Sequence, residues 1–281
     1  FVNLFVDERV RSLGFGTLLI KRAMEEKSPA MVIGYNPDSF SIYQKLGDWR
    51  GLGKFYRYAY IFNQDSVKKL LPADVTKHHI ILNKGAKHDG SEESHGLIFE
   101  QIKTFDKSFD DFWKSVRSRY VITTERTSIY MNWRYANHPH FKYNIQIAKK
   151  DNQIMGYIIY RIETVDNFSI VRIVDFVSQE QVQTVILQNF LSEVRTQADM
   201  ADFMFSGQQY HETLKKLGFF DVCGTSFEKF PIYFNPIDYS KNYINFCAWK
   251  KQESIDKNVF YNRNNWYLTK GDSDQDRPNP H

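Results

Sequence analysis

A glycine-containing loop near the start of the chain has the residue types that bind a diphosphate. It reads Arg11-Ser12-Leu13-Gly14-Phe15-Gly16 and stands between an apolar stretch and a helical pattern. Backbone N–H groups at a helix N-terminus point outward, and the helix dipole adds a partial positive charge there. Glycine lets a ligand lie directly against the backbone. The pattern predicts an anion-binding loop, although a plain turn before a helix would fit the same letters.

A second pattern follows twenty residues later. Asn36 comes directly after an apolar run, the small residue Ser39 three positions on, and Tyr43 seven positions on, before Lys45-Leu46-Gly47. Asn36-Pro37-Asp38 has helix-start chemistry, and we expect Asp38 to cap a helix that Gly47 ends. Tyr43 would then lie one turn before the end of this helix. A tyrosine hydroxyl can serve as a general acid, or it can sit at the edge of a core with its hydroxyl in water.

Helices and strands must position the residues of these two patterns. The first 70 residues predict a strand at 1–6, a charged turn at 7–13 and a helix at 17–26. A strand buried on both faces is expected at 30–35, a helix at 39–46 and an aromatic-rich strand at 55–62. Strands that alternate with helices in this order indicate an α/β fold with a mixed sheet.

Together the two patterns resemble the GNAT acetyltransferase superfamily. The resemblance implies that Arg11, Ser12, Leu13, Gly14, Phe15 and Gly16 form its acyl-CoA pyrophosphate loop. It also implies that Asn36 and Ser39 contact the pantetheine arm of acetyl-CoA, and that Tyr43 faces the thioester sulfur as general acid. Leu4, Phe5 and Val6 would lie along pantetheine and offer a backbone N–H to the carbonyl oxygen. Asp48 departs from the family pattern, which usually has an aromatic or apolar residue after the glycine.

A general base is not identifiable in the chain. The carboxylate that the family often places on its first strand would fall at or before Phe1, and Asp7 and Glu8 are expected to be solvated. Because the chain opens on Phe1 inside an apolar stretch, we expect further residues to precede it. Whether these include a targeting signal stays open, and the expected location is the cytoplasm.

The remaining sequence predicts a linker and a second cycle of elements. Residues 72–96 form the linker, residues 97–250 a second domain and residues 251–281 an extension, after a first domain at 1–71. Strands are expected at 97–102, 144–149, 154–163, 168–177, 202–205 and 242–249, and helices at 109–119, 179–200 and 210–217. The tail at 271–278 is expected to be a surface loop.

The second domain resembles the same fold without its chemistry. Residues 170–177 take the place of 1–6, and residues 210–219 take the place of 39–49. Residues 178–183 contain no glycine, however, and Leu214 stands where the first copy has Tyr43. Side chains keep a backbone away from a pyrophosphate. We therefore expect two GNAT-like domains in tandem, the first lacking its N-terminal strands, and a second copy that completes the substrate cleft without binding CoA.

A few other residues could take part in function. Trp133 could face the substrate or pack at the domain entrance, and Asp175 on a buried strand could contact the substrate or form a structural ion pair. His138-Pro139-His140 lacks a neighbouring acidic or cysteine partner for a metal. Asp272, Asp274 and Asp276 begin like a calcium loop but lack its glycine, since Arg277 stands there. We predict no metal site.

Composition narrows the function classes. The 281 residues carry 37 Lys and Arg against 33 Asp and Glu, a net charge of +4 that is too weak and dispersed to indicate nucleic acid. Two cysteines, Cys223 and Cys247, cannot build a disulfide framework. No apolar run approaches the roughly 18 residues of a spanning helix, so no membrane association is expected.

The favoured function is transfer of an acetyl group from acetyl-CoA to a primary amine, with an amino sugar or its nucleotide derivative as the preferred small-molecule acceptor. One alternative is aminoacyl transfer from tRNA, as in the Fem family, which would not need the pyrophosphate loop. Another is a non-catalytic protein that binds CoA as a regulatory ligand. The acyl chain and the oligomeric state are not indicated by the sequence.

Overall fold

The computed structural model describes residues 6–70, 96–234, 237–240, 243–251 and 255–276. Its two largest sheets are a three-stranded sheet of order β1-β13-β2 and a seven-stranded sheet of order β10-β3-β9-β8-β7-β6-β4. The architecture is mixed α/β, as predicted. The strands are β1 (Ala30–Ile33), β2 (Arg50–Lys54), β3 (Tyr56–Ile61), β4 (Ile98–Gln101), β5 (Ile122–Thr123), β6 (Asn144–Lys150), β7 (Gln153–Val165), β8 (Phe168–Ser178), β9 (Met200–Phe205), β10 (Phe220–Asp221), β11 (Tyr233–Phe234), β12 (Ile237–Asp238), β13 (Asn245–Trp249) and β14 (Trp266–Tyr267).

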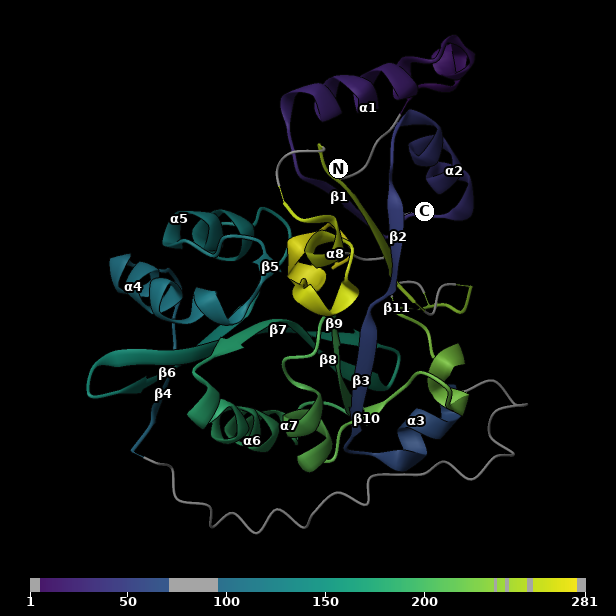
Figure 1. Cartoon of the computed structure of the whole chain (residues 1–281). Coiled ribbons are helices and arrows are strands. Elements are labelled where there is room, and N and C mark those ends of the chain that lie inside the picture. The colour runs from purple at the N-terminus through teal and green to yellow at the C-terminus, as the bar shows by residue number, and fades with distance from the viewer. Residues whose placement is uncertain (1–5, 71–95, 235–236, 241–242, 252–254, 277–281) are drawn as a thin grey trace.

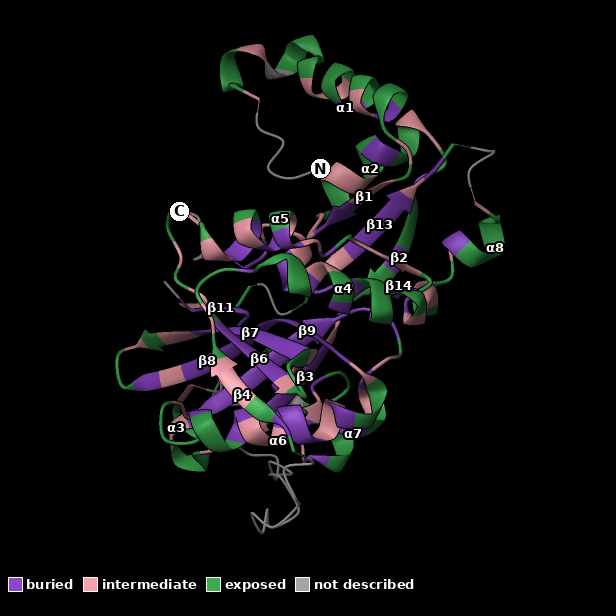
Figure 2. Cartoon of the chain, turned by 90° about the vertical axis from the view of Figure 1, so that its left-hand side faces the viewer, coloured by how far each residue is buried: buried purple, intermediate pink, exposed green. Residues whose placement is uncertain are grey.

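Helices cover both faces of the large sheet. Helices α4 (Lys107–Val116) and α5 (Ser128–Met131) lie on one face, with α6 (Gln183–Val194) and α7 (His211–Lys216) on the other (Figure 1). The apolar spacing predicted for α4 is confirmed, because Phe109, Phe112, Trp113 and Val116 are all buried. Helices α1 (Phe15–Glu26) and α2 (Pro37–Leu46) accompany the small sheet, while α3 (Gln64–Leu70) and α8 (Lys257–Phe260) are short. Most strands of the large sheet are buried (Figure 2).

The two sheets exchange strands. β3 follows β2 along the chain, yet it pairs with β9 and β10 in the large sheet. β13 comes late in the chain, yet it pairs with β1 and β2 in the small sheet. A linear division into residues 1–71 and 97–250 therefore does not separate the two sheets.

The parallel pair β8 and β9 separates along its length. The two strands pair only where Ile170–Ile173 face Met200–Phe203. Beyond that point the C-terminal segment enters: Phe205 forms a bridge with Thr269, and the Tyr267 hydroxyl donates to the Phe176 carbonyl. The segment, yellow in Figure 1, lies in the middle of the molecule. The prediction of a surface loop at 271–278 is wrong over the described part, because Gly271, Gln275 and Asp276 are buried.

Other boundaries also differ from the sequence predictions. The expected helix at 179–200 stops at Val194, and Met200 already begins β9. β1 is half-buried at Ala30 and Met31 rather than buried on both faces. Strand β2 and helix α3 were not predicted. The expected strand at 1–6 and the linker at 72–96 lie almost wholly outside the described residues.

Candidate functional site

The predicted loop at 11–16 is shorter in the structure, because residues 11–13 lie in a 3₁₀-helix and α1 already begins at Phe15. A 3₁₀-helix, η1 (Glu8–Leu13), leads to Gly14, which caps α1 in the left-handed region at φ 79°. Leu18 N–H donates to the Gly14 carbonyl (3.1 Å), and N–H groups ahead of it have no acceptor within an α-helix. A Cβ atom at Gly14 would meet no heavy atom within 4 Å. The backbone here is therefore open to a ligand.

The other predicted loop residues lie on either side of Gly14 in the chain. Leu13 and Phe15 are exposed large apolar side chains, Ser12 is exposed, and Gly16 is half-buried at the start of α1. Arg11 lies within η1. Val6 is half-buried, whereas Leu4 and Phe5 lie outside the described residues.

Asn36 and Ser39 form the N-terminal cap of α2. Asn36 Oδ1 accepts from Ser39 N–H (2.8 Å), and Ser39 Oγ accepts from Asn36 N–H (3.1 Å). The expectation that Asp38 caps this helix is wrong, because the reciprocal bonds of a capping box start it two residues earlier. The side-chain oxygen of Asn36 is already hydrogen-bonded to the backbone of the helix. Its side-chain NH₂ group is therefore the part that suits a ligand.

Tyr43 projects from α2 into a small core. Its side chain is 5% exposed and its ring centroid lies 5.1 Å from that of Trp49. Met24 and Cys247 belong to the same cluster. Burial, with a smaller contribution from the Cys247 thiol, raises the pKa of Tyr43. The hydroxyl therefore keeps its proton at neutral pH, which a general acid requires.

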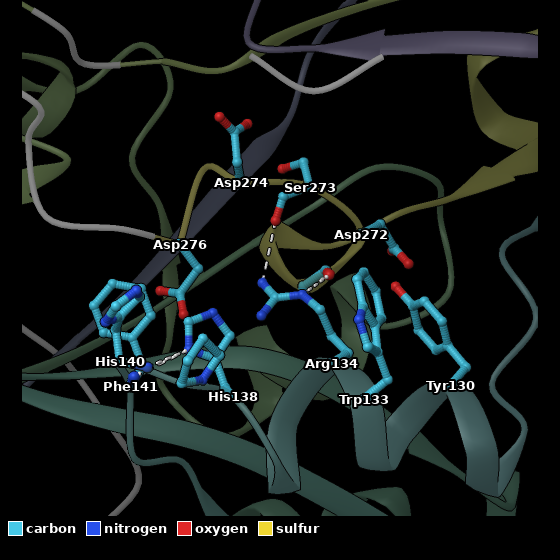
Figure 3. A pocket seen from close by; sticks show the side chains of 12 residues that line it. Tyr130, Trp133, Arg134, His138, His140, Phe141, Asp272, Ser273, Asp274 and Asp276 are labelled. Carbon is cyan, nitrogen blue, oxygen red and sulfur yellow. Dashed lines mark hydrogen bonds between the residues drawn. The ribbon is translucent and has the colours of Figure 1, made fainter.

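A cavity of about 570 Å³ lies between the C-terminal segment and the chain that follows α5. Figure 3 shows Trp133 and Tyr130 on one side, Arg134 at the base and His138 with His140 on the other side. The remaining wall is the C-terminal segment from Gly271 to Asp276. Trp133, a predicted substrate contact, thus lines the cavity, and its side chain is 68% exposed.

A π-helix, η3 (Asn132–Ala136), presents the cavity wall. Such π-helical turns are rare and concentrate at functional sites. Arg134 on this turn holds the C-terminal segment, donating to the carbonyls of Gly271 (2.8 Å) and Ser273 (3.1 Å). The width of the cavity is therefore fixed by bonds between two segments 137 residues apart in the chain.

Asp175, the other predicted substrate contact, does not line the cavity. Its carboxylate is 1% exposed and accepts from Arg126 Nε (2.9 Å) and from the Tyr157 hydroxyl (2.8 Å). Arg126 also bonds Asp272 (3.0 Å), which does line the cavity. The structure places Asp175 in a buried network, the structural ion pair that the sequence left as an alternative.

The histidines near the cavity are arranged for packing. His138 Nδ1 accepts from the backbone N–H of His140 (3.2 Å) and of Phe141 (3.0 Å), so the ring proton is on Nε2. Burial, and then Arg134, lower the pKa of His138, which is therefore neutral at pH 7. Across the described part of the chain, no group of three or more His, Cys, Asp or Glu could hold a metal ion.

Gln275 joins the cavity to the end of β1. A Cβ atom at Gly34 would collide with the Gln275 side chain, so these residues are in close contact. Gln275 Oε1 accepts from the Tyr233 hydroxyl (2.6 Å), and its Nε2 donates to Asp274 (3.1 Å) in the cavity wall. Because Gly34 stands two residues before Asn36, the cavity lies close to the predicted pantetheine contacts.

Acid should weaken the ion pairs that hold this wall. Burial alone would raise the pKa of Asp276, but Arg161 and Lys270 outweigh it and hold that pKa well below its usual range. Asp276 therefore adds stability above about pH 4, and this stability is lost as pH falls further. We expect the free energy of unfolding in urea to drop between pH 7 and pH 3, and to drop less in Asp276→Asn. An equal drop in both proteins would exclude this contribution.

Sequence reasoning did not predict that the lining residues share a cavity. Tyr130, Arg134 and Phe141 have no spacing that indicates a common site, and their partners in the C-terminal segment lie more than 130 residues away. Trp133, the two histidines and Asp272, Asp274 and Asp276 each had a separate interpretation in the sequence, and nothing indicated that they form one wall.

No protein-family model matches the chain, and no curated protein matches it. Solved structures do. One is a GCN5-related N-acetyltransferase from Anabaena variabilis, with TM-score 0.53 and 14% identity, covering 85% of this chain and 51% of that one. Another is a GCN5-related N-acetyltransferase from Kribbella flavida, with TM-score 0.47 and 12% identity, covering 86% of this chain and 49% of that one.

This chain thus spans about half the length of those two structures. No described helix is long and apolar enough to cross a membrane. At 14% identity the likeness to the Anabaena protein bears on the fold. That likeness shows that the chain has a GNAT-like fold.

Proposed function

We propose that the chain is part of an acyl-CoA-dependent N-acetyltransferase that acetylates a primary amine. The observation that carries this proposal is the open, left-handed backbone of Gly14 at the start of α1, in a GNAT-like fold. A diphosphate suits such a place because it needs N–H donors and a partial positive charge, with no side chain in between.

The residues present fit acetyl-CoA. The backbone of residues 12–16 would hold its diphosphate, and the Asn36 NH₂ group would face its pantetheine arm. When bound, acetyl-CoA supplies the activated thioester. Tyr43 holds its proton on the hydroxyl at neutral pH, because burial raises its pKa, and would donate it toward the leaving sulfur.

We assign the amine acceptor to the cavity beside Trp133. An exposed indole offers a flat apolar platform of the kind that packs against a sugar ring, which favours an amino sugar or its nucleotide derivative. The amine would enter near Asp274, whose carboxylate is oriented by Gln275 and could accept its proton. The contact between Gln275 and Gly34 supports this route, because it brings the cavity wall to the end of β1.

We further propose that the large sheet is a second, non-catalytic GNAT-like unit. Its strands β8 and β9 separate as a ligand slot would require, but the C-terminal segment fills the gap with Tyr267 and Thr269. The turn before α6 is η4 (Glu180–Val182), which offers no glycine. Both features support a unit that shapes the acceptor cavity and binds no CoA.

Tyr43→Phe tests the proposal. We expect kcat to fall about 100-fold, while the affinity for acetyl-CoA stays within twofold. Thiol release would be followed with glucosamine and with UDP-linked amino sugars, and acetyl-CoA affinity by calorimetry. Tyr60→Phe, a half-buried tyrosine of the large sheet, is the matched control.

Each outcome has a clear meaning. Absence of acetyl-CoA binding to the wild type would refute the proposal. Binding without turnover of any amine would favour the regulatory alternative. An unchanged kcat in Tyr43→Phe would remove Tyr43 from the mechanism.

A further inference from the structure

A buried cluster of charged side chains joins the large sheet to the C-terminal segment. Four cations belong to it: Arg57 on β3, Arg161 on β7, Arg172 on β8 and Lys270 in the C-terminal segment. Its three carboxylates are Glu163 on β7, Asp202 on β9 and Asp276. We call this group the Lys270 cluster. It is separate from the tyrosine and glycine loop of the proposed function.

Two of the cations, Arg57 and Arg161, are hydrogen-bonded to the carboxylates of the cluster. Arg57 bonds Asp202 with Nη2 at 2.8 Å and reaches the carbonyls of Phe230 and Pro231. Arg161 bonds Asp276 with Nη2 at 3.0 Å and Glu163 at 2.5 Å. The bonds to the three carboxylates are charge-assisted hydrogen bonds.

The other two cations have nitrogen atoms that lack an acceptor in the described part of the chain, although Arg172 Nη1 donates to the Ile232 carbonyl. Lys270 and Arg172 are each 1% exposed. Over the residues that the structure describes, Lys270 Nζ has no hydrogen-bond partner, and neither do Arg172 Nε and Nη2. The carboxylates of Glu163 and Asp202 lie 3.7 Å from the Arg172 nitrogens, too far for a hydrogen bond. Buried donors without acceptors cost free energy, and cationic ones cost the most.

The cluster also carries an excess of positive charge. Four cations face three carboxylates, which leaves a net charge of +1 away from water. Burial, and then Arg172, lower the pKa of Lys270 to about 8, so the ammonium still carries its proton at pH 7. The neighbouring Asp175 and Asp272 bond Arg126 and make no hydrogen bond to Lys270 or Arg172. A buried charge of this kind needs a counter-ion.

We propose that a small monovalent anion of the chloride class binds between Lys270 Nζ and the Nε and Nη2 atoms of Arg172. It gives three unpartnered donors an acceptor and brings the cluster to neutrality. A water molecule in the same place would accept hydrogen bonds but leave the charge. Lys270 and Arg172 do not line the Trp133 cavity, so the ligand is distinct from the acceptor. The anion ties the C-terminal segment to the sheet and thereby supports one wall of that cavity.

Thermal unfolding at pH 7 tests the site. The melting temperature is compared in sodium chloride and in sodium gluconate at equal ionic strength, with gluconate too large for the cluster. We expect chloride to raise the melting temperature by at least about 2 °C, and Lys270→Met to remove this difference. Lys250→Met, which changes a buried lysine that donates to the Lys251 carbonyl, should keep the difference.

Crystals of the wild type soaked in bromide give a second readout that does not depend on a variant folding. An anomalous peak between Lys270 and Arg172 supports the proposal. Equal melting temperatures in the two salts, a difference that persists in Lys270→Met, or a cluster without a bromide peak would each overturn it. None of these results depends on acetyl-CoA or on turnover.

Discussion

Replacing Arg126 by methionine is expected to lower the free energy of unfolding by about 3–5 kcal/mol. The guanidinium is buried and bonds both oxygens of Asp175 (2.9 and 3.2 Å) as well as Asp272 (3.0 Å). Methionine leaves two carboxylates inside the protein without their cation. Urea denaturation followed by circular dichroism measures the loss.

Three comparisons separate lost charge pairing from other causes of this loss. Adding Asp175→Asn and Asp272→Asn to the Arg126→Met variant should recover part of the loss, because the stranded charges disappear. The defect should also shrink as pH falls from 7 to 5, since buried carboxylates without a cation take up protons readily. Arg22→Met, which removes an exposed arginine with salt bridges on α1, should cost under about 0.5 kcal/mol. A similar loss in Arg22→Met would contradict the argument.

The elements around the glycine loop could be predicted from local sequence patterns. Gly14 had to be glycine because it adopts φ 79°, and the apolar spacing in α4 could be recognised from neighbouring letters. The cap of α2 was misjudged for a local reason. Both Asn36 and Asp38 are good caps, and only the bonds to Ser39 show which one starts the helix.

Long-range partners could not be predicted in the same way. The 271–276 segment is polar and resembles a loop, but Asp272 and Asp276 bond Arg126 and Arg161, each more than 110 residues earlier. The exchange of strands between the two sheets could not be predicted either, because it also depends on long-range partners. The letters of β3 indicate a strand, but they do not say that its neighbours are β9 and β10 rather than β2.

The cavity follows from that exchange. Because β13 lies in the small sheet, the chain must return from there to reach the Trp133 side of the large sheet, and residues 266–276 make this return. Trp133 was recognised as a substrate-facing candidate by type alone. Its neighbours in the wall are set by tertiary structure.

Gly14→Trp is expected to weaken acetyl-CoA binding at least about 1,000-fold, or roughly 4 kcal/mol. The space above Gly14 is empty, so an indole there would occupy the place proposed for the diphosphate. The left-handed backbone adds strain for any residue with a Cβ atom. Calorimetry with acetyl-CoA gives the affinity, and a thermal melt shows whether the variant is folded.

Gly224→Trp is a closely matched control. Gly224 has φ 75° and equally open space around its Cβ position, but it lies on the turn after β10, in the large-sheet part of the molecule. Both variants introduce the same side chain into the same backbone region, so strain and added apolar surface are equal. Affinity lost only in Gly14→Trp locates the diphosphate at α1. If both variants bind acetyl-CoA with the same affinity, the diphosphate does not lie at Gly14. The role assigned to Tyr43 would then be wrong as well, because Tyr43 is proposed to act on a sulfur that this loop holds in place.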